Sequence, residues 1–391
     1  MHILIVPSEH FVTLDNPLAG IFQMHQARAL SAAGFQVGVA GSGFKSPRRI
    51  MNRYVYSARE IIDGVAVVRR YRSRIIPEKL TPTPLLIRQT TRALRMTINH
   101  YISEFGRPDV IHAHNFLYGG IAATKIGAAL GIPVVVTEHS SVFLKHSVPI
   151  RVKKFLRRAS LDARSVIAVS RRLSNEILEF VDIPINISTI SNVVASEFIN
   201  HERCQDTPKS GSPVFVSVGS LDRNKNHQIL LRAFASEFKS TSATLKIIGT
   251  GELLSELVAY ANELGISDQV DFLGYLGSND VIRVLDGATC FVLTSRLETF
   301  GVALIEALSR GLPLIATRCG GPEDIVNEAN GFLIDSDDDD ALRLALSEMG
   351  RNYARFSPEE IRRSATKRYG EESFVKSLKQ IYDECLITRR Q

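Results

Sequence analysis

Two glutamates eight residues apart, Glu298 and Glu306, are the side chains of this sequence that most strongly suggest chemistry. Glu306 lies among apolar residues of a helical segment, and a carboxylate in such surroundings needs a hydrogen-bond partner. Gly301 stands between the two acids and allows the backbone to approach a ligand without the obstruction of a Cβ atom. A capping Glu and a stray helical Glu would explain either acid alone, but not the whole string from Glu298 to Ala316.

The string reads ETFGVALIEALSRGLPLIA and resembles the Glu-x7-Glu motif of the retaining GT-B glycosyltransferases of family 4. The resemblance extends over nearly the entire chain. Ser170 and Asn192 fit the family, although Ser191 replaces the usual Pro before that Asn. The other matching segments are 108–114 (PDVIHAH), 136–139 (VTEH), 217–221 (SVGSL), 225–226 (KN), 249–251, 272–274 and 320–323 (GGPE).

This resemblance implies a donor that is a nucleotide sugar and catalytic roles for Glu298, His139 and Lys225. Lys225 and backbone N–H groups at a helix N-terminus would stabilise the diphosphate leaving group. Glu306 would bind the ribose hydroxyls, Glu298 would orient the donor sugar, and His139 would lie near the sugar and the acceptor. The donor-binding residues implied are Gly20, Ser220, Arg223, Lys225, Gly249, Gly274, Tyr275, Leu276, Thr299, Phe300, Gly301, Val302 and Glu306.

One position departs from the family pattern. The family often carries Arg directly after Val-Gly, where this chain has Ser220. Lys225 is retained, and Arg223 is a second cation of the same loop that could reach the phosphates. Lys225 and Arg223 are therefore the cations expected to hold the diphosphate.

Two series of alternating strands and helices predict two Rossmann-like, doubly wound α/β domains facing across a cleft, the GT-B architecture. The expected domains are an acceptor-binding domain over 1–200, a nucleotide-sugar domain over 201–370 and a helix over 371–391 that crosses back. The predicted strands are 3–7, 36–40, 65–70, 110–112, 134–137 and 166–169, then 214–218, 244–248, 270–272, 290–293, 314–316 and 332–334. Predicted helices include 21–33, 121–130, 227–238 and 253–264.

Composition limits the class of protein. Hydrophobic residues make up 45% and charged residues 23% of 391 residues, which is typical of a globular protein. The apolar run 126–137 is too short for a membrane span of about 20 residues, and the N-terminus lacks the basic region and cleavage site of a signal peptide.

The four cysteines are widely spaced and are expected to be reduced thiols in a cytoplasmic protein. A dinucleotide-dependent dehydrogenase is disfavoured because 7–20 contains no GxGxxG.

Charge is divided between the halves: 25 Lys/Arg against 12 Asp/Glu in residues 1–195, and 22 against 29 in residues 196–391. Solvated faces explain a basic half by default, but an anionic membrane surface or lipid-diphosphate acceptor also fits. Nucleic acid is not expected, because no groove-reading motif is present. The basic residues closest in sequence are Lys145, Arg151, Lys153, Lys154, Arg157, Arg158, Arg164, Arg171 and Arg172.

No metal and no other cofactor is expected. His112, His114 and His139 lack an acidic partner at ligand spacing and are better explained as core or pocket-lining histidines. Asp335-Ser336-Asp337 resembles a metal-binding Asp-x-Asp, but it precedes a helix and is expected to supply its cap and first turn.

The predicted activity is metal-independent, retaining transfer of a sugar from a nucleotide sugar, with a UDP-sugar as the expected donor, to a saccharide or lipid-linked saccharide in cell-surface polysaccharide or glycolipid synthesis. The enzyme would be cytoplasmic, with peripheral binding to the inner face of a membrane. Three alternatives stay open: a soluble small-molecule acceptor, a catalytically idle GT-B partner subunit, and a GT-B phosphorylase or epimerase.

Overall fold

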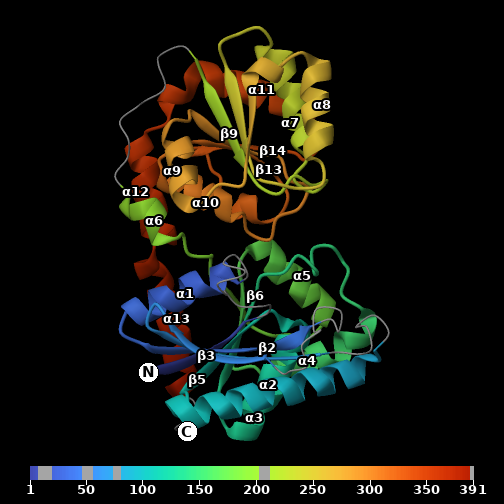
Figure 1. The fold of residues 1–391 in the computed structure, drawn as a ribbon, viewed down its shortest axis with the longest axis vertical. Helices are drawn as coiled ribbons and strands as arrows, with labels where there is room; N and C mark the ends of the chain where they lie inside the picture. Colours follow the sequence, from blue (N-terminus) through green and yellow to red (C-terminus); the bar gives the residue numbers. More distant parts are fainter. Residues whose placement is uncertain (8–19, 46–55, 74–80, 202–211, 388–391) are drawn as a thin grey trace. The chain divides into compact units, whose positions relative to one another are not determined.

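The computed structural model describes residues 1–7, 20–45, 56–73, 81–201 and 212–387. By contact density the chain divides into two units. Unit 1 contains residues 1–193 and 374–391, and unit 2 contains residues 194–373. Each unit is built around its own sheet (Figure 1).

Unit 1 contains a sheet with the strand order β3-β4-β2-β1-β5-β6-β7-β8. Every neighbouring pair is parallel except β3 and β4, which are antiparallel at the edge. The inner strands are continuous apolar runs because helices cover both faces of a parallel sheet. The strands are β1 His2–Val6, β2 Gln36–Lys45, β3 Tyr56–Ile62, β4 Val65–Ser73, β5 Val110–His114, β6 Val134–Glu138, β7 Ser165–Ala168 and β8 Ile187–Thr189.

Two helices of unit 1 begin or end at residues that are typical caps. Ser170 caps α5, and its hydroxyl accepts a hydrogen bond from Leu173 N at 3.3 Å. Gly131 ends α3 in the left-handed conformation, which glycine adopts without steric cost. The helices are α1 Ile21–Ala32, α2 Thr83–Phe105, the π-turn Phe116–Gly120, α3 Ile121–Leu130, the 3-10 turn Ile150–Val152, α4 Lys153–Asp162 and α5 Arg171–Val181.

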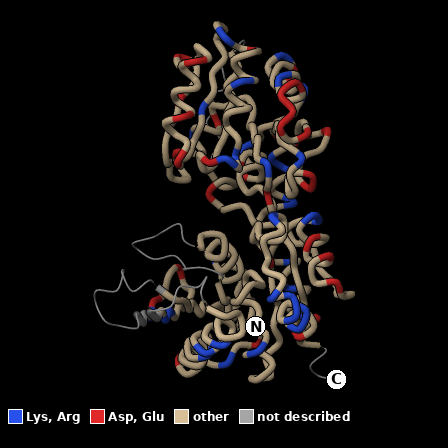
Figure 2. The backbone as a smooth tube through the Cα atoms, turned by 90° about the vertical axis from the view of Figure 1, so that its right-hand side faces the viewer, with Lys and Arg blue, Asp and Glu red and all other residues tan. Residues whose placement is uncertain are grey.

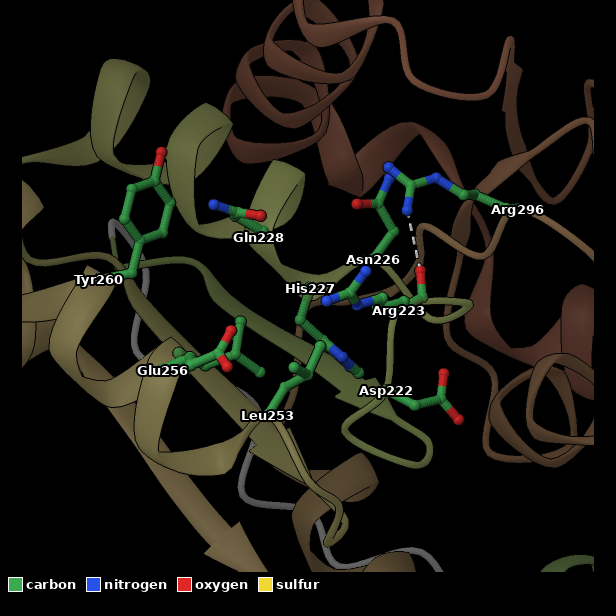
Figure 3. Close-up of a pocket in the computed structure, with 10 residues that line it drawn as sticks. Asp222, Arg223, Asn226, His227, Gln228, Leu253, Glu256, Tyr260 and Arg296 are labelled. Carbon is green, nitrogen blue, oxygen red and sulfur yellow. Dashed lines mark hydrogen bonds between the residues drawn. The ribbon is translucent and has the colours of Figure 1, made fainter.

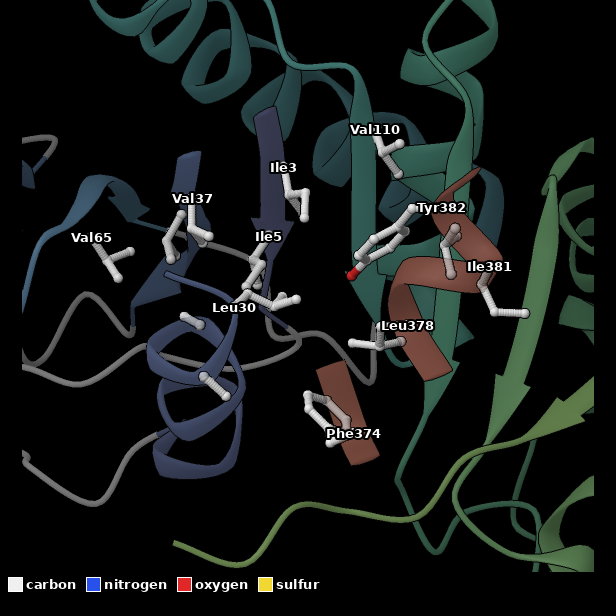
Figure 4. Packing of buried hydrophobic residues seen from close by; sticks show 14 of the residues in the cluster. Ile3, Ile5, Leu30, Val37, Val65, Val110, Phe374, Leu378, Ile381 and Tyr382 are labelled. Carbon is white, nitrogen blue, oxygen red and sulfur yellow. The ribbon is translucent and has the colours of Figure 1, made fainter. Parts of the chain in front are cut away.

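The last helix of the chain, α13 (Glu371–Ile387), packs into the core of unit 1. Phe374, Leu378 and Tyr382 belong to one buried cluster with Ile3 of β1 and Val110 of β5 (Figure 4). The spacing of four residues places the three α13 side chains on one helix face. The C-terminal segment is therefore part of the fold of the N-terminal unit.

Unit 2 contains a parallel sheet with the strand order β11-β10-β9-β12-β13-β14. The order reverses between β9 and β12, which is the kind of point where open α/β sheets bind ligands at the carboxyl ends of strands. The strands are β9 Val214–Val218, β10 Thr244–Ile248, β11 Val270–Gly274, β12 Cys290–Leu293, β13 Leu314–Thr317 and β14 Gly331–Ile334. The helices are α6 Ser196–Asn200, α7 His227–Phe238, α8 Leu254–Leu264, α9 Ser278–Asp286, α10 Val302–Ser309, α11 Asp339–Asn352 and α12 Pro358–Tyr369, with 3-10 turns at Ser267–Gln269, Gly321–Asp324 and Tyr353–Arg355.

The predicted fold class, two α/β units with mainly parallel sheets, is confirmed. The sequence analysis did not predict the edge strand β3, and it ended β2 and β4 too early. Lys and Arg occur together with Asp and Glu over both units (Figure 2). Within the described residues, no helix has the length and apolar character that a membrane crossing requires.

Candidate active site

The backbone around Glu298 is held by the neighbouring strand-end loop. Glu298 N donates to Cys319 O at 2.8 Å, and Gly321 N donates to Glu298 O at 2.8 Å. A Cβ atom on Gly321 would lie 2.2 Å from the backbone of Phe300, so this approach requires glycine. These two hydrogen bonds thus hold the loops after β12 and β13 together at the carboxyl ends of the strands.

The Glu298 side chain forms an ion pair with Lys225. Ser295 Oγ, which is buried, donates to the same carboxylate oxygen at 2.7 Å. The side chains of Lys225 and Glu298 are 23% and 13% exposed, so the pair is accessible but largely desolvated. The structure therefore brings together two predicted catalytic residues that are 73 positions apart in sequence. Ser295 was not among the predicted site residues.

Asp222 shapes the loop that carries Lys225. Its carboxylate accepts from Ser220 Oγ at 2.6 Å, Asn224 N at 2.9 Å and Lys225 N at 3.1 Å. Burial alone would raise the pKa of Asp222, but these hydrogen bonds outweigh it and lower the pKa. Ser220, where the family often has Arg, therefore bonds to the carboxylate that holds the Lys225 loop in shape.

Arg223 does not join the ion pair of Lys225 and Glu298. It lines a cavity of about 290 Å³ beside the start of α7, together with Tyr260 and Arg296 (Figure 3). Arg296 Nη1 donates to the carbonyl oxygen of Arg223 at 3.0 Å. Among the described residues, no acceptor or acidic partner is found for the Arg223 guanidinium.

The loops after β9, β10 and β11 lie in direct contact. Gly249 has φ 141°, and a Cβ atom there would lie 1.8 Å from Gly219 O. Gly249 N donates to Gly274 O at 2.8 Å. Gly274 has φ 67°, and Tyr275 after it is 61% exposed, while Leu276 is half-buried. These predicted donor-binding residues thus share the strand ends with Lys225.

Helix α10 begins directly after the loop that carries Glu298. Gly301 has φ 97° and is its N-cap. In the part of the chain that the structure describes, the N–H groups of Thr299, Phe300 and Gly301 donate to no protein acceptor. Free N–H groups at the start of a helix suit an anion. Phe300 is buried, and Thr299 and Val302 are half-buried.

Glu306 lies on the second turn of α10. Burial raises the pKa of its carboxyl group to about 7. Its side chain is half-buried and, within the described residues, has no hydrogen-bond or ion-pair partner. A ligand hydroxyl would supply the partner that the chain lacks.

His139, the predicted catalytic residue of unit 1, belongs to a stack of three histidines. Its ring lies 5.1 Å from that of His114, and the latter lies 4.7 Å from His112. His114 Nδ1 lies 2.9 Å from His139 Nε2. His112 contacts the hydroxyls of Tyr382 and Thr137, each at 2.7 Å. Burial lowers the pKa of His139 to about 4 and that of His112 to about 3, so these rings are neutral near pH 7.

The backbone at His139 is fixed by two side chains that the sequence analysis did not select. Glu138, fully buried, accepts from the N–H groups of Phe116, His139 and Ser140 and from the Ser140 hydroxyl. Burial raises its pKa, and these bonds oppose the rise. Asn115 Oδ1 also accepts from His139 N, at 2.9 Å.

Two other predictions can be compared with the structure. Gly20, the remaining predicted donor residue, is the N-cap of α1 with φ 70°. The prediction that Asp335 and Asp337 supply the cap and first turn of α11 is wrong. Asp337 is paired with Arg296, and Asp335 is paired with Arg318. The cap is Asp338, whose carboxylate accepts from Ala341 N.

Comparisons with known proteins identify the family of this chain. The profile of "Glycosyltransferase Family 4" matches residues 19–198, and that of "Glycosyl transferases group 1" matches residues 199–370. The chain belongs to the family 4 glycosyltransferases and has the GT-B fold. This glycosyltransferase is an enzyme of polysaccharide or glycoconjugate synthesis.

Its relatives include the N-acetyl-alpha-D-glucosaminyl L-malate synthase of Bacillus anthracis, 27% identical over 71% of this chain and 75% of the relative. A Campylobacter jejuni N-acetylgalactosaminyltransferase that acts on a diphospho-undecaprenol-linked saccharide is 27% identical over 54% of this chain and 58% of its own. Among solved structures, Anabaena HepE in complex with UDP and glucose superposes with a TM-score of 0.69 at 15% identity, covering 98% of this chain and 99% of its own.

Proposed function

We propose that the enzyme transfers a sugar from a UDP-sugar with retention of configuration and without a metal ion. The observation that carries the proposal is the pairing of Lys225 with Glu298 beside the free N–H groups at the start of α10. Structural neighbours bound to UDP support uracil as the base.

The leaving group of such a reaction is a nucleoside diphosphate. Lys225 would balance its negative charge, and the N–H groups of Phe300 and Gly301 would donate to its oxygens. These groups supply what a divalent cation supplies in metal-dependent transferases. EDTA is therefore expected to leave the rate unchanged, and loss of activity that Mn²⁺ restores would overturn this part of the proposal.

The two acids of the motif would take different parts of the donor. Glu306 would accept from the ribose hydroxyls, which explains a carboxylate without a protein partner. Glu298 would accept from hydroxyls of the transferred sugar, while Ser295 keeps its carboxylate in place. His139 of unit 1 would contact the sugar or the acceptor.

In the proposed step, the acceptor oxygen attacks the anomeric carbon on the face from which the diphosphate leaves. The bond from the anomeric carbon to the diphosphate oxygen breaks, and the diphosphate takes the bonding electrons. The acceptor proton passes to a diphosphate oxygen, so no covalent intermediate on the protein is needed. An NMR assignment of the product's anomeric configuration tests retention directly.

The test of the site is Glu298→Ala, which should abolish transfer while UDP still binds. Glu256→Ala is the matched control, because Glu256 lines the separate cavity beside Arg223. Turnover of Glu298→Ala near that of the wild type would refute the assignment. Loss of UDP binding together with turnover would instead give Glu298 a structural role.

We propose a saccharide or lipid-linked saccharide as the acceptor, by analogy with the Campylobacter relative. The Bacillus relative, an N-acetyl-alpha-D-glucosaminyl L-malate synthase by name, favours a soluble small-molecule acceptor as the second candidate. Measuring UDP release from UDP-sugars with polyprenyl-diphosphate saccharides and with small hydroxy acids separates the two.

The exposed side of α4 supports an anionic membrane as a partner at the cytoplasmic side. Two large apolar side chains, Ile150 and Leu161, are 75% and 62% exposed there. They alternate with exposed basic residues at helical spacing, which is typical of a helix that binds at a membrane surface. We define this α4 stripe as the exposed residues Ile150, Arg151, Lys154 and Leu161, which lie on the turn Ile150–Val152 and on α4.

Not all the basic residues in this region are available for lipid. Lys153 and Arg157 pair with Asp182, Arg158 pairs with Asp162, and Arg172 pairs with Glu176. Each unpaired Lys or Arg near an anionic surface contributes on the order of 1 kcal/mol. The α4 stripe, rather than the whole basic half of the sequence, should therefore carry the binding.

Sedimentation with vesicles tests the α4 stripe. The wild type should bind phosphatidylglycerol vesicles at low salt, bind less at 1 M salt because of screening, and not bind neutral vesicles. Ile150→Ser/Leu161→Ser and Arg151→Glu/Lys154→Glu should each weaken binding at least tenfold. Leu344→Ser in unit 2, also an exposed leucine, is the control. No sedimentation of the wild type at low salt would refute a membrane role and leave the transferase proposal intact.

A further inference from the structure

The hydrogen bond between His114 and His139 has a direction that the surrounding atoms determine. Both rings are neutral, so each carries one N–H group. Only one of the two facing nitrogens, His114 Nδ1 and His139 Nε2, can therefore carry the shared proton. The other proton of the pair lies on a ring nitrogen that faces away from this bond.

One buried polar atom distinguishes the possible arrangements. His114 Nε2 is buried and has no hydrogen-bond partner among the described residues. The nitrogen on which His114 carries its proton therefore decides whether a buried N–H group is left without an acceptor.

If His139 donated from Nε2, His114 would carry its own proton on Nε2, which would be a buried N–H group without an acceptor. In the opposite arrangement His114 Nε2 is a bare lone pair, and the proton of His139 lies on Nδ1. Buried N–H donors without partners are the rarer defect in proteins.

We propose that His114 is a positioning residue that donates its Nδ1–H to His139 Nε2 and so holds His139 as the Nδ1–H tautomer. The consequence for catalysis rests on the proposed role of His139 at the sugar or acceptor. A histidine in the wrong tautomer presents a lone pair where a donor is needed, or the reverse.

The rest of the stack keeps His114 in place. His114 lies between the rings of His112 and His139, and the hydroxyls of Tyr382 and Thr137 occupy both nitrogens of His112. Tyr382 belongs to α13, so the C-terminal helix supports the orientation of His139 through two intervening rings. This gives the buried His-x-His pair of β5 a role that needs no metal.

The direct test is ¹⁵N-histidine NMR of the ligand-free protein. The His139 signals, identified by their loss in His139→Gln, should show a proton on Nδ1 and none on Nε2. His114→Asn keeps an N–H donor near the position of Nδ1 and should preserve this pattern. His114→Val removes the donor and should produce a mixture of tautomers. A wild-type His139 protonated on Nε2 would overturn the proposal.

Kinetics supply the second readout. His114→Val should lower kcat about tenfold or more, as expected when a catalytic histidine loses the group that sets its tautomer, with little change in the donor KM. His114→Asn should recover most of the rate, and His146→Asn, at an exposed histidine, should have no effect. Equal losses in the Asn and Val variants, with the NMR pattern unchanged, would mean that His114 is only structural. Because the NMR readout needs no turnover, it stands apart from any failure of the proposed function.

Discussion

Glu306 should make the affinity for UDP depend on pH in a way that can be calculated. Burial raises the pKa of its carboxyl group to about 7, and no described protein group is bonded to it. Ribose hydroxyls donate more strongly to a carboxylate than to a protonated carboxyl group. UDP should therefore bind preferentially to the ionised form of Glu306.

The magnitude follows from the fraction of enzyme that is ionised. One unit below the pKa about a tenth of the molecules carry the charge, and one unit above it about nine tenths do. The affinity for UDP should thus rise roughly tenfold between about pH 6 and pH 8, equivalent to about 1.4 kcal/mol. In Glu306→Gln this contribution is absent, and only the titration of UDP itself remains.

Isothermal titration calorimetry with UDP at three pH values measures the effect. Wild type and Glu306→Gln should differ in the slope of the logarithm of Kd against pH, whereas Glu256→Gln should follow the wild type. Parallel slopes in wild type and Glu306→Gln would refute the argument that Glu306 contacts the donor as a carboxylate.

The same group should affect stability in the absence of ligand. The folded-state pKa lies above that of the unfolded chain, so the folded protein binds the proton more tightly, and its stability falls as pH rises from the unfolded value toward 7. Partial exposure reduces the effect, so Glu306→Gln should increase the free energy of unfolding by about 2–3 kcal/mol at pH 8 and by little at pH 4. Urea unfolding at the two pH values would contradict this if the variant gained equally at both.

Three further predictions concern single contacts. Gly249→Ala should destabilise the protein by about 3 kcal/mol or more in urea unfolding, because its Cβ would lie 1.8 Å from Gly219 O; Gly277→Ala, with open space around it, is the control. Arg310→Ala should lower the free energy of unfolding by about 3–5 kcal/mol, because it leaves the buried Asp286 carboxylate without its ion pair. The double variant Arg310→Met/Asp286→Leu should regain part of this stability. An equal loss in both variants would show that the ion pair is not the cause. Ser295→Ala should cost about 1 kcal/mol of stability and lower kcat several-fold by freeing the Glu298 carboxylate; unchanged kcat would show that Lys225 alone orients it.

Buried parallel strands were the part of the fold most readable from sequence. β9, β10 and β12 begin and end where their apolar runs do, because both faces of a parallel sheet are covered and a polar residue interrupts the pattern at once. β2 extends beyond its predicted end at residue 40 into residues such as Ser42 and Gly43, and β4 extends beyond its predicted end at residue 70 as far as Ser73. These extensions pair with each other near the sheet edge, where polar side chains are tolerated, so hydropathy alone could not detect them.

The sequence next to the edge strand β3 contains a turn signal that the sequence analysis did not use. Asp63-Gly64 separates β3 from β4, and both residues have positive φ, 50° and 79°. Asp-Gly between two extended segments is a strong indicator of a two-residue hairpin. Hydrophobicity gave no such indication, because β3 contains Arg59 and Glu60. Local turn chemistry, rather than burial, was the way to find this strand.

At the candidate site, individual residues could be predicted from the sequence, but the contacts between them could not. The resemblance identified both the Glu298 motif and Lys225, but not their ion pair, since Lys225 precedes Glu298 by 73 positions. Asp222 and Ser295 are ordinary polar residues in sequence. They gain a role only because the order of strands in unit 2 places the loops after β9 and β12 side by side.

Taken together, the contacts divide the site residues into those that the chain satisfies and those that it leaves open. Glu298, Lys225 and Asp222 already have protein partners, so their geometry is set before a ligand binds. Glu306 and the N–H groups of Phe300 and Gly301 have no protein partner among the described residues. A carboxylate that lacks a donor lies two helical turns or less from N–H groups that lack an acceptor. A ligand with hydroxyls near an anionic group satisfies both at once, and a nucleoside diphosphate has this arrangement.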